Sequence, residues 1–232
     1  MAFVRESRYF CVEMNPSKQP PIGRMKLFGE PGWGSAIVEA QLGWYGFEYD
    51  FERVGDLFKS AASRQRLASV NPLAQIPTLV LDDGRVMTES AAITLHLADL
   101  TGDDSLVPGA GHASRVAFLR WLMFIVANVY PTYTYADDPT RFVAASDAPQ
   151  NFKSAVDQYA QKLYGILEGE AREPWFLGER FSALDIYVCV MTRWRPKRPW
   201  FAEHAPRLFA IASRTEGVDR LAAVWRKNYP DG

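Results

Sequence analysis

A glutamate and a serine, Glu89 and Ser90, stand together where a helical pattern begins, and their chemistry suits a small zwitterionic ligand. The N–H groups of a helix start are unpaired and lie at the positive end of the helix dipole, so they can bind a carboxylate. The Ser90 hydroxyl adds a donor, and the Glu89 carboxylate can accept from an ammonium group. A ligand with an α-carboxylate and an α-amine would satisfy both residues. The alternative is an ordinary helix N-terminus.

The residues around this pair predict a hairpin followed by a helix. Residues 78–81 are apolar and partly β-branched, which predicts a buried strand. The dipeptide Asp83-Gly84 is a two-residue hairpin signal, and residues 86–88 return as a short strand. Apolar residues then recur at helical spacing until Gly102, which is suited to end a helix.

The stretch from Asn71 to Asp99 resembles the N-terminal, thioredoxin-like domain of the glutathione S-transferases. In that family a segment N-P-x-x-x-[IV]-P is followed by a hairpin and then by E-S-x-A-I. This chain has N-P-L-A-Q-I-P at 71–77 and E-S-A-A-I at 89–93. The motif is long and its parts occur in the family's order, so it indicates the fold strongly and glutathione as the ligand.

The resemblance implies roles for five residues. It implies that the Ile76–Pro77 peptide is cis and that the backbone of Ile76 pairs with the cysteinyl part of glutathione, as an added strand would. Glu89 and Ser90 would hold the γ-glutamyl end. Gln75 matches a position that often helps to bind the tripeptide.

Family enzymes carry a Tyr, Ser or Cys after the first strand, where it stabilises the thiolate of glutathione. Here the position of the bacterial cysteine falls on Gly34, and Ser35 is the only hydroxyl of the loop. Lowering a thiol pKa from about 8.5 to about 6.5 stabilises the anion by roughly 2.7 kcal/mol. We expect Ser35 to be the catalytic donor and Trp33 to shield the site. In the alternative, Ser35 only caps the helix, and backbone N–H groups near Gly34 bind the sulfur.

The absence of a cysteine in this loop weighs against disulfide exchange, which needs a protein thiolate or a mechanism with two glutathiones. Cys189 lies in an apolar helical pattern and is expected to be inert core.

The electrophile is expected to bind between the domains, against the first helix of the second domain. Tyr133 and Tyr135 follow the expected helix end at Tyr130, where aromatic rings with polar tips can face a cleft. Trp121 has an alternative place in the core, as does Phe124. The expected pocket consists of Trp33, Trp121, Asn128, Tyr133 and Tyr135.

Turn-rich segments divide the chain into four parts. Residues 1–24 carry several prolines and are expected to extend outside the fold; 25–102 form the thioredoxin-like α/β domain; 103–112 are a linker; and 113–232 form an all-helical domain. The first domain is expected to run β-α-β-α-β-β-α, with strands at 25–28 and 49–54 around a helix at 36–44 capped by Ser35, and a second helix at 57–67.

The second domain shows helical patterns at 115–130, 152–168, 206–213 and 219–227. Ser182 and Asp185 have the spacing of a capping box, with Phe181 against Ile186 as a hydrophobic staple. The basic run 193–198 is most simply a solvated helix end, with phosphate or nucleic-acid binding as the alternative.

Composition is that of an ordinary soluble protein. The chain has 232 residues, 48% hydrophobic and 23% charged, with a formal net charge of -1. This balance gives no reason to expect nucleic acid or an anionic membrane as a partner. Two cysteines make no disulfide framework, and three scattered histidines show no metal-ligand spacing, so no metal is expected and the cytoplasm is the expected compartment.

These features favour a glutathione transferase that conjugates the glutathione thiolate to a hydrophobic electrophile. Related isomerase, dehalogenase or peroxidase chemistry stays open. The resemblance implies a homodimer. The alternative is a non-catalytic binding or interaction module of the same fold. Gly34 supports that alternative, whereas the retained Ile76-Pro77 and Glu89-Ser90 pairs argue against it.

Overall fold

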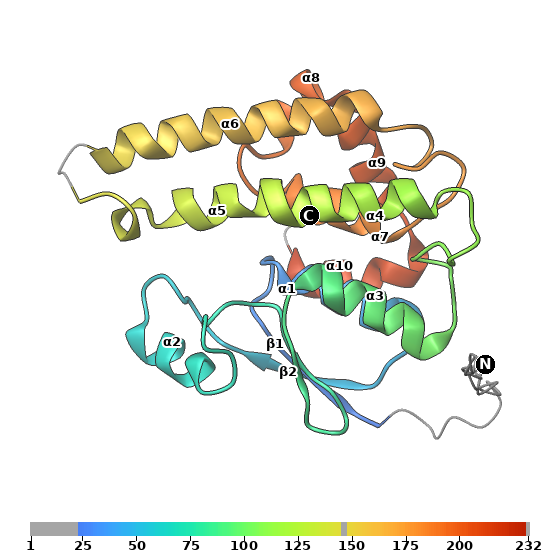
Figure 1. Cartoon of the computed structure of the whole chain (residues 1–232), viewed down its shortest axis with the longest axis horizontal. Helices are drawn as coiled ribbons and strands as arrows, with labels where there is room; N and C mark the ends of the chain where they lie inside the picture. Colours follow the sequence, from blue (N-terminus) through green and yellow to red (C-terminus); the bar gives the residue numbers. More distant parts are fainter. Residues whose placement is uncertain (1–22, 145–147, 231–232) are drawn as a thin grey trace, which may run out of the picture.

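The structure, a computed structural model, describes residues 23–144 and 148–230. Figure 1 shows a small sheet with α1 and α3 on one face, and a bundle of helices packed beyond them. The extension expected at 1–24 lies outside the described residues except for Gly23 and Arg24. Gly23 already belongs to the fold, because its N–H donates to the Asp82 carboxylate over 2.7 Å.

The sheet has the strand order β2-β1-β3-β4. Its strands are β1 (Met25–Gly29), β2 (Tyr49–Arg53), β3 (Thr78–Val80) and β4 (Val86–Met87). β1 pairs in parallel with β2 and antiparallel with β3, with Leu27 opposite both Phe51 and Leu79. This is the predicted thioredoxin-like order, in which a helix carries the chain from β1 across to β2.

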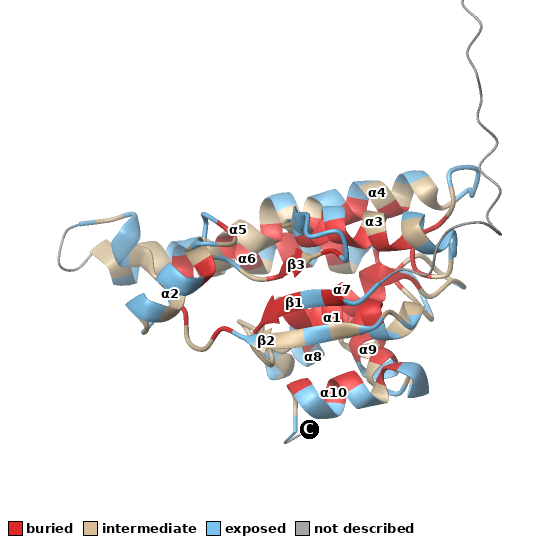
Figure 2. Cartoon of the chain, turned by 90° about the horizontal axis from the view of Figure 1, so that it is seen from below, coloured by how far each residue is buried: buried red, intermediate tan, exposed pale blue. Residues whose placement is uncertain are grey.

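Helix α1 (Ser35–Tyr45) is buried on all sides over its first eight residues. Val38 and Leu42 pack in the core beneath the sheet, whereas Ile37 and Ala40 belong to the core of the helical part. α1 also contacts α3, α7 and α10. Figure 2 shows buried residues concentrated where the sheet, α1 and α7 meet. The segment just before α1 is therefore held between both halves of the molecule.

Helices α2 (Ala61–Ala68) and α3 (Ser90–Thr101) complete the first part. α2 begins later than the expected position 57, because the Ser60 hydroxyl caps it by accepting from the Ser63 N–H over 3.1 Å. α3 matches the prediction and ends at Gly102, whose φ of 62° lies in the left-handed region that glycine adopts readily.

The rest of the described chain is helical, as predicted. Its helices are α4 (Arg115–Phe124), the π-helix η2 (Ile125–Val129), α5 (Tyr130–Asp137), α6 (Ala148–Glu170), α7 (Ala183–Met191), α8 (Arg198–His204), α9 (Pro206–Glu216) and α10 (Ala222–Asn228), with short 3₁₀ turns η3 (Pro139–Arg141) and η4 (Asp219–Leu221). In Figure 1, α6 lies alongside α4 and α5. α8 was not expected from the sequence.

The expected helix end at Tyr130 is wrong, because the helix continues without a break to Asp137. Pro131 has no N–H and its ring would clash with the preceding turn of an α-helix. The chain widens to the π-helix η2 just before it, and this keeps the helix continuous. By length and composition alone, helix 115–137 could cross a membrane, but Phe118, Leu122 and Ile125 pack in the core of the bundle.

The predicted capping box at the start of α7 is present. The Asp185 carboxylate accepts from the N–H groups of Ser182 and Phe176, each over 2.7 Å. It is fully buried, and burial raises the pKa of Asp185 to about 7 despite these hydrogen bonds.

Candidate functional site

The start of α1 lies against the proline turn that precedes β3. A Cβ placed on Gly34 would lie 3.5 Å from the Ile76 carbonyl oxygen, 3.7 Å from Pro77 Cδ and 3.9 Å from Trp194 Cη2. The Ile76–Pro77 peptide is cis, as the resemblance implied. Three segments that are distant in sequence thus meet at one point. Gly34 and the Ile76–Pro77 pair were predicted site residues, whereas Trp194 was not.

Buried polar side chains hold the turn before Pro77. Asn71 Nδ2 donates to the Gln75 carbonyl and to Thr78 Oγ1, each over 3.0 Å. The Thr78 hydroxyl donates to the same Gln75 carbonyl over 2.7 Å. The Gln75 backbone is therefore fixed while its side chain stays exposed. Asn71 belongs to the family motif, but its place in that motif does not indicate this supporting role.

Glu89 also lies at this end of the sheet. Met87 faces Leu79 in the antiparallel β3–β4 pair. Glu89 follows the end of β4, and Pro77 directly precedes β3, so both residues lie at this end of the pair. The backbone of Glu89 has φ 63°, a left-handed conformation that is uncommon outside glycine, and its side chain is exposed. Such strain often marks ligand sites.

Ser90 is the first residue of α3 and is 4% exposed. The next turn of the helix is tied to α7, because Thr94 Oγ1 donates to the Ser90 carbonyl over 2.9 Å and lies 3.2 Å from the Tyr187 hydroxyl. Burial raises the pKa of Tyr187 to about 12, and that of Tyr130 well above its ordinary value. The Tyr130 hydroxyl is buried without a hydrogen-bond partner among the described residues.

Ser35 has a structural contact in this structure. Its side chain is fully buried, and its hydroxyl donates to the Glu30 carbonyl and accepts from the Glu30 N–H, both over 3.1 Å. Gly29 makes room for it, since a Cβ there would lie 2.5 Å from Ser35. Ser35 is the first helical residue and Gly34 the cap, so the expected Ser35 cap is wrong.

That Ser35 activates a thiol stays a prediction, and this geometry favours the other part of the alternative, in which backbone N–H groups near Gly34 bind the sulfur. The first N–H groups of a helix have no partner inside it. Ala36 and Ile37 use theirs on the Trp33 and Gly34 carbonyls. Among the described residues this leaves the N–H groups of Gly34 and Ser35 as donors with no backbone partner, next to the Ile76 carbonyl.

The expected electrophile pocket is split between separate places. Trp33 is half-buried and packs on Phe58, with ring centroids 5.2 Å apart. Trp121 is 4% exposed and packs edge-on against Phe176 in the helical core, which was its alternative assignment. These two residues come from opposite parts of the molecule, and Trp121 is not available to a ligand.

Tyr133 lies closer to the Gly34 site. Its ring packs edge-on against Trp194 at 5.1 Å. Its hydroxyl is engaged with the Tyr164 hydroxyl and donates to the Arg195 carbonyl over 2.9 Å. Its polar tip therefore supports the fold, and only the ring is available to contribute to a cleft.

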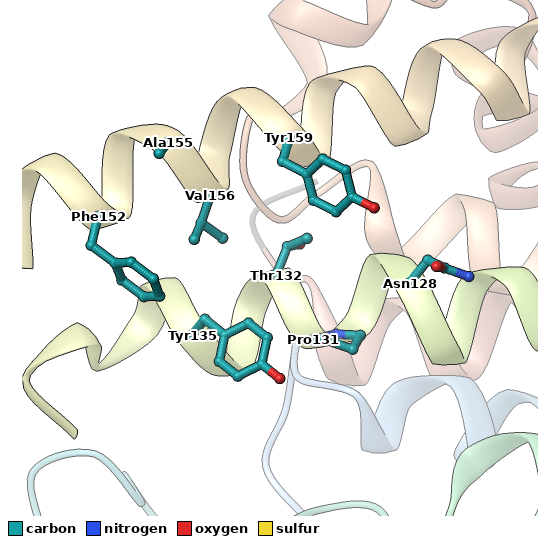
Figure 3. A pocket seen from close by; sticks show the side chains of 8 residues that line it. All are labelled: Asn128, Pro131, Thr132, Tyr135, Phe152, Ala155, Val156 and Tyr159. Carbon is teal, nitrogen blue, oxygen red and sulfur yellow. The ribbon is translucent and has the colours of Figure 1, made fainter. Parts of the chain in front are cut away.

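Asn128 and Tyr135 line a hollow of about 270 Å³ between α5 and α6. Figure 3 shows the two helices presenting apolar side chains to it from both sides. The other lining residues are Pro131, Thr132, Phe152, Ala155, Val156 and Tyr159. Neither Gly34 nor Trp194 lines this hollow, so it is separate from the site at α1.

Trp194 is the site residue that sequence reasoning missed, because it lies inside the basic run. The arginines of that run are used in ion pairs: Arg193 and Arg198 bind Glu216, and Arg195 binds Asp137 and Asp157. The tryptophan between them turns to Gly34. A large aromatic within a charged run was the available signal.

Two further kinds of site are relevant to the described part of the chain, a reactive cysteine and a metal site. Cys189 is fully buried, and burial raises its thiol pKa to about 12, as expected for inert core. Residues 23–144 and 148–230 contain no group of three or more His, Cys, Asp or Glu side chains that could hold a metal ion.

Comparison with known proteins agrees with this geometry. The family model described as "Glutathione S-transferase, N-terminal domain" matches residues 37–100. The uncharacterized GST-like protein YncG of Escherichia coli K12 is 40% identical over 205 residues, which cover 88% of this chain and 98% of that protein.

Solved structures show the same fold. A glutathione transferase homologue from Sulfitobacter with bound glutathione has a TM-score of 0.78 at 20% identity, covering 88% of this chain and 98% of its own. A sphingomonad glutathione S-transferase complexed with glutathione has a TM-score of 0.68 at 28% identity, covering 87% and 97%. With YncG 40% identical over nearly its whole length, and with residues 37–100 matching the family's N-terminal domain, this chain belongs to the glutathione S-transferase family.

Proposed function

We propose that this protein binds glutathione and transfers its thiolate to a hydrophobic electrophile. The observation that supports this most is the packing of Gly34 against the Ile76–Pro77 cis peptide, at the end of the sheet where Glu89 follows β4. The Ile76 main chain would pair with the cysteinyl part of glutathione. The γ-glutamyl carboxylate would lie at the start of α3 on Ser90, with its ammonium group on Glu89.

The thiol would then lie beside Gly34. The N–H groups of Gly34 and Ser35, together with the dipole of α1, would stabilise the thiolate. The thiol proton leaves to solvent, and a sulfur lone pair forms the new bond to carbon. The leaving group departs with the electron pair of the bond that joined it to this carbon. Ser35 would donate its hydroxyl only after releasing Glu30.

The electrophile would bind where Trp33, Trp194 and the ring of Tyr133 border the thiol. The exposed Gln75 side chain would contact the tripeptide. We propose a cytoplasmic homodimer, as the family resemblance implies. Isomerase, dehalogenase or peroxidase chemistry at the same thiolate would use the same residues.

The first test is calorimetric titration with glutathione at neutral pH, with Glu89→Ala beside the wild type. Losing the partner of the ammonium group should weaken binding at least about tenfold, or about 1.4 kcal/mol. Glu48→Ala is the matched control, because Glu48 is an exposed carboxylate outside the site. Absence of binding by the wild type in the millimolar range would refute the proposal.

A second candidate is a binding module without turnover. It is favoured by the lack of a cysteine in the loop and by the engagement of the Ser35 hydroxyl with Glu30. Glutathione binding without conjugation of any electrophile in a panel of activated halides, epoxides and enones would select this candidate.

A further inference from the structure

Gly32, two residues before Gly34, is held on both sides by the helical part of the molecule. Its N–H donates to Asn228 Oδ1 over 3.0 Å, and its carbonyl accepts from Trp194 Nε1 over 2.9 Å. Its φ of 79° lies in the left-handed region, which glycine adopts readily. Two side chains from distant segments thus fix both peptide groups of this residue.

The Asn228 side chain is itself fixed, because all its polar groups are used. It is 5% exposed, and its Nδ2 donates to Glu39 Oε2 over 2.8 Å and to the Val224 carbonyl over 3.0 Å. Glu39 is fully buried on α1 and also accepts from the Tyr49 hydroxyl over 2.9 Å. With both donor directions occupied, the Asn228 oxygen must face Gly32.

The Trp194 ring is fixed by its neighbours. It packs edge-on against Tyr133 and lies 5.9 Å from the Tyr130 ring. With the ring in this position, its Nε1 reaches Gly32 while its far edge reaches Gly34. One side chain therefore binds the loop at Gly32 and lies close to Gly34, on the other side of Trp33.

The loop is also closed at its beginning. The Ser35 hydroxyl binds both backbone groups of Glu30, and the Trp33 N–H donates to the Glu30 carbonyl over 3.1 Å. Glu30 and Gly32 are thus anchored, and the chain between them and Gly34 is only a few residues long. The direction of the free N–H groups depends on these anchors.

We propose that Asn228 and Trp194 are positioning residues, which hold Gly32 and thereby aim the Gly34 and Ser35 N–H groups at the glutathione thiolate. This inference rests on the proposed function. Hydrogen bonds weaken steeply as donors turn away from the acceptor, and preorganised donors stabilise a charge without a reorganisation cost. Releasing Gly32 should therefore raise the pKa of the bound thiol while the γ-glutamyl contacts stay intact.

The test compares the wild type with Asn228→Ala, which removes the acceptor, and Trp194→Phe, which removes the indole N–H but keeps a ring. Thiolate absorbance of bound glutathione is titrated from pH 5 to 10. Each variant should raise the bound thiol pKa by about one and, from a wild-type value of about 6.5, lower kcat/KM with an activated chloronitrobenzene about fivefold at pH 6.5. For Asn228→Ala, which does not border the electrophile, the loss at pH 9 should be less than about twofold. Affinity for S-methylglutathione, which has no thiol, should not change.

Val224→Ala is the matched control. Val224 is buried on α10, the helix that carries Asn228, and packs on α1 near Gly43. Its side chain is not among the neighbours of Gly32. It should loosen α10 without moving the thiol pKa. An unchanged pKa of the bound thiol in both Asn228→Ala and Trp194→Phe, or an equal rise of this pKa in Val224→Ala, overturns the inference. A wild type that binds neither glutathione nor S-methylglutathione refutes the proposed function and this inference with it.

Discussion

Removing the Ser35 hydroxyl distinguishes a structural role from a catalytic one. In Ser35→Ala the Glu30 N–H loses its partner, the Glu30 carbonyl keeps only the Trp33 N–H, and the change lies at a fully buried side chain. Leaving buried polar groups unsatisfied costs about 1–3 kcal/mol, so the free energy of unfolding should fall by about that amount. If backbone N–H groups hold the thiolate, the bound thiol pKa should hardly change.

The two roles differ in which quantity changes. If Ser35 donates to the thiolate, its loss removes up to roughly 2.7 kcal/mol of anion stabilisation, which is about a hundredfold in kcat/KM below the thiol pKa. If it does not, kcat/KM should fall less than about threefold at pH 6.5. For Ser35→Ala we therefore expect a large loss in the free energy of unfolding and a small loss in kcat/KM.

The assay combines urea unfolding with kcat/KM at pH 6.5 and the thiolate absorbance of bound glutathione. Ser60→Ala is the matched control, because Ser60 caps α2 through one hydrogen bond and its loss should cost about 1 kcal/mol without touching the loop. A hundredfold rate loss in Ser35→Ala with unchanged unfolding would refute the structural argument and restore Ser35 as the donor.

Two further predictions concern buried charges. Lys227 pairs with the fully buried Glu39, so Lys227→Met should lower the free energy of unfolding, measured in urea, by about 1–3 kcal/mol. The control Lys59→Met breaks an exposed pair with Asp56 and should change this free energy by less than about 0.5 kcal/mol. Equal effects of the two substitutions would show that the burial of Glu39 does not matter. Burial raises the folded-state pKa of Asp185 from 3.8 to about 7. Its contribution is therefore fully present below about pH 4 and is lost as pH rises through 7. Urea unfolding of the wild type should show this decline, by at most roughly 4 kcal/mol, and Asp185→Asn should flatten it; the same slope in both proteins would contradict the assignment.

Much of the first part of the molecule was predictable because its signals are local. The Asp83-Gly84 turn and the spacing after Glu89 predicted β3, β4 and α3. The capping box at Ser182 was equally local and is confirmed. Each of these structures closes through hydrogen bonds within a few residues, so residue types and spacing suffice to specify them.

The predictions that failed depended on contacts with residues that the local sequence pattern does not specify. Serine at position 35 is a residue type that often caps helices. Its hydroxyl instead binds Glu30, because Gly29 leaves room for the Ser35 side chain. The expected stop at Tyr130 failed, because a π-helix accommodates Pro131. Trp121 and Tyr135 were both expected in the electrophile pocket, but packing buries the first and exposes the second.

The sequence by itself determined the family motif, the strand and helix order of the first domain, and the residues suited to the γ-glutamyl end. Only the tertiary structure decided what holds the Gly32–Gly34 loop, where we propose that the thiol binds. Asn228 and Trp194 reach Gly32 from 196 and 162 residues away. Their side-chain directions depend on Glu39, Tyr133 and the packing of α1 between the two halves. Such contacts are set by the three-dimensional position of whole helices, which no local periodicity encodes.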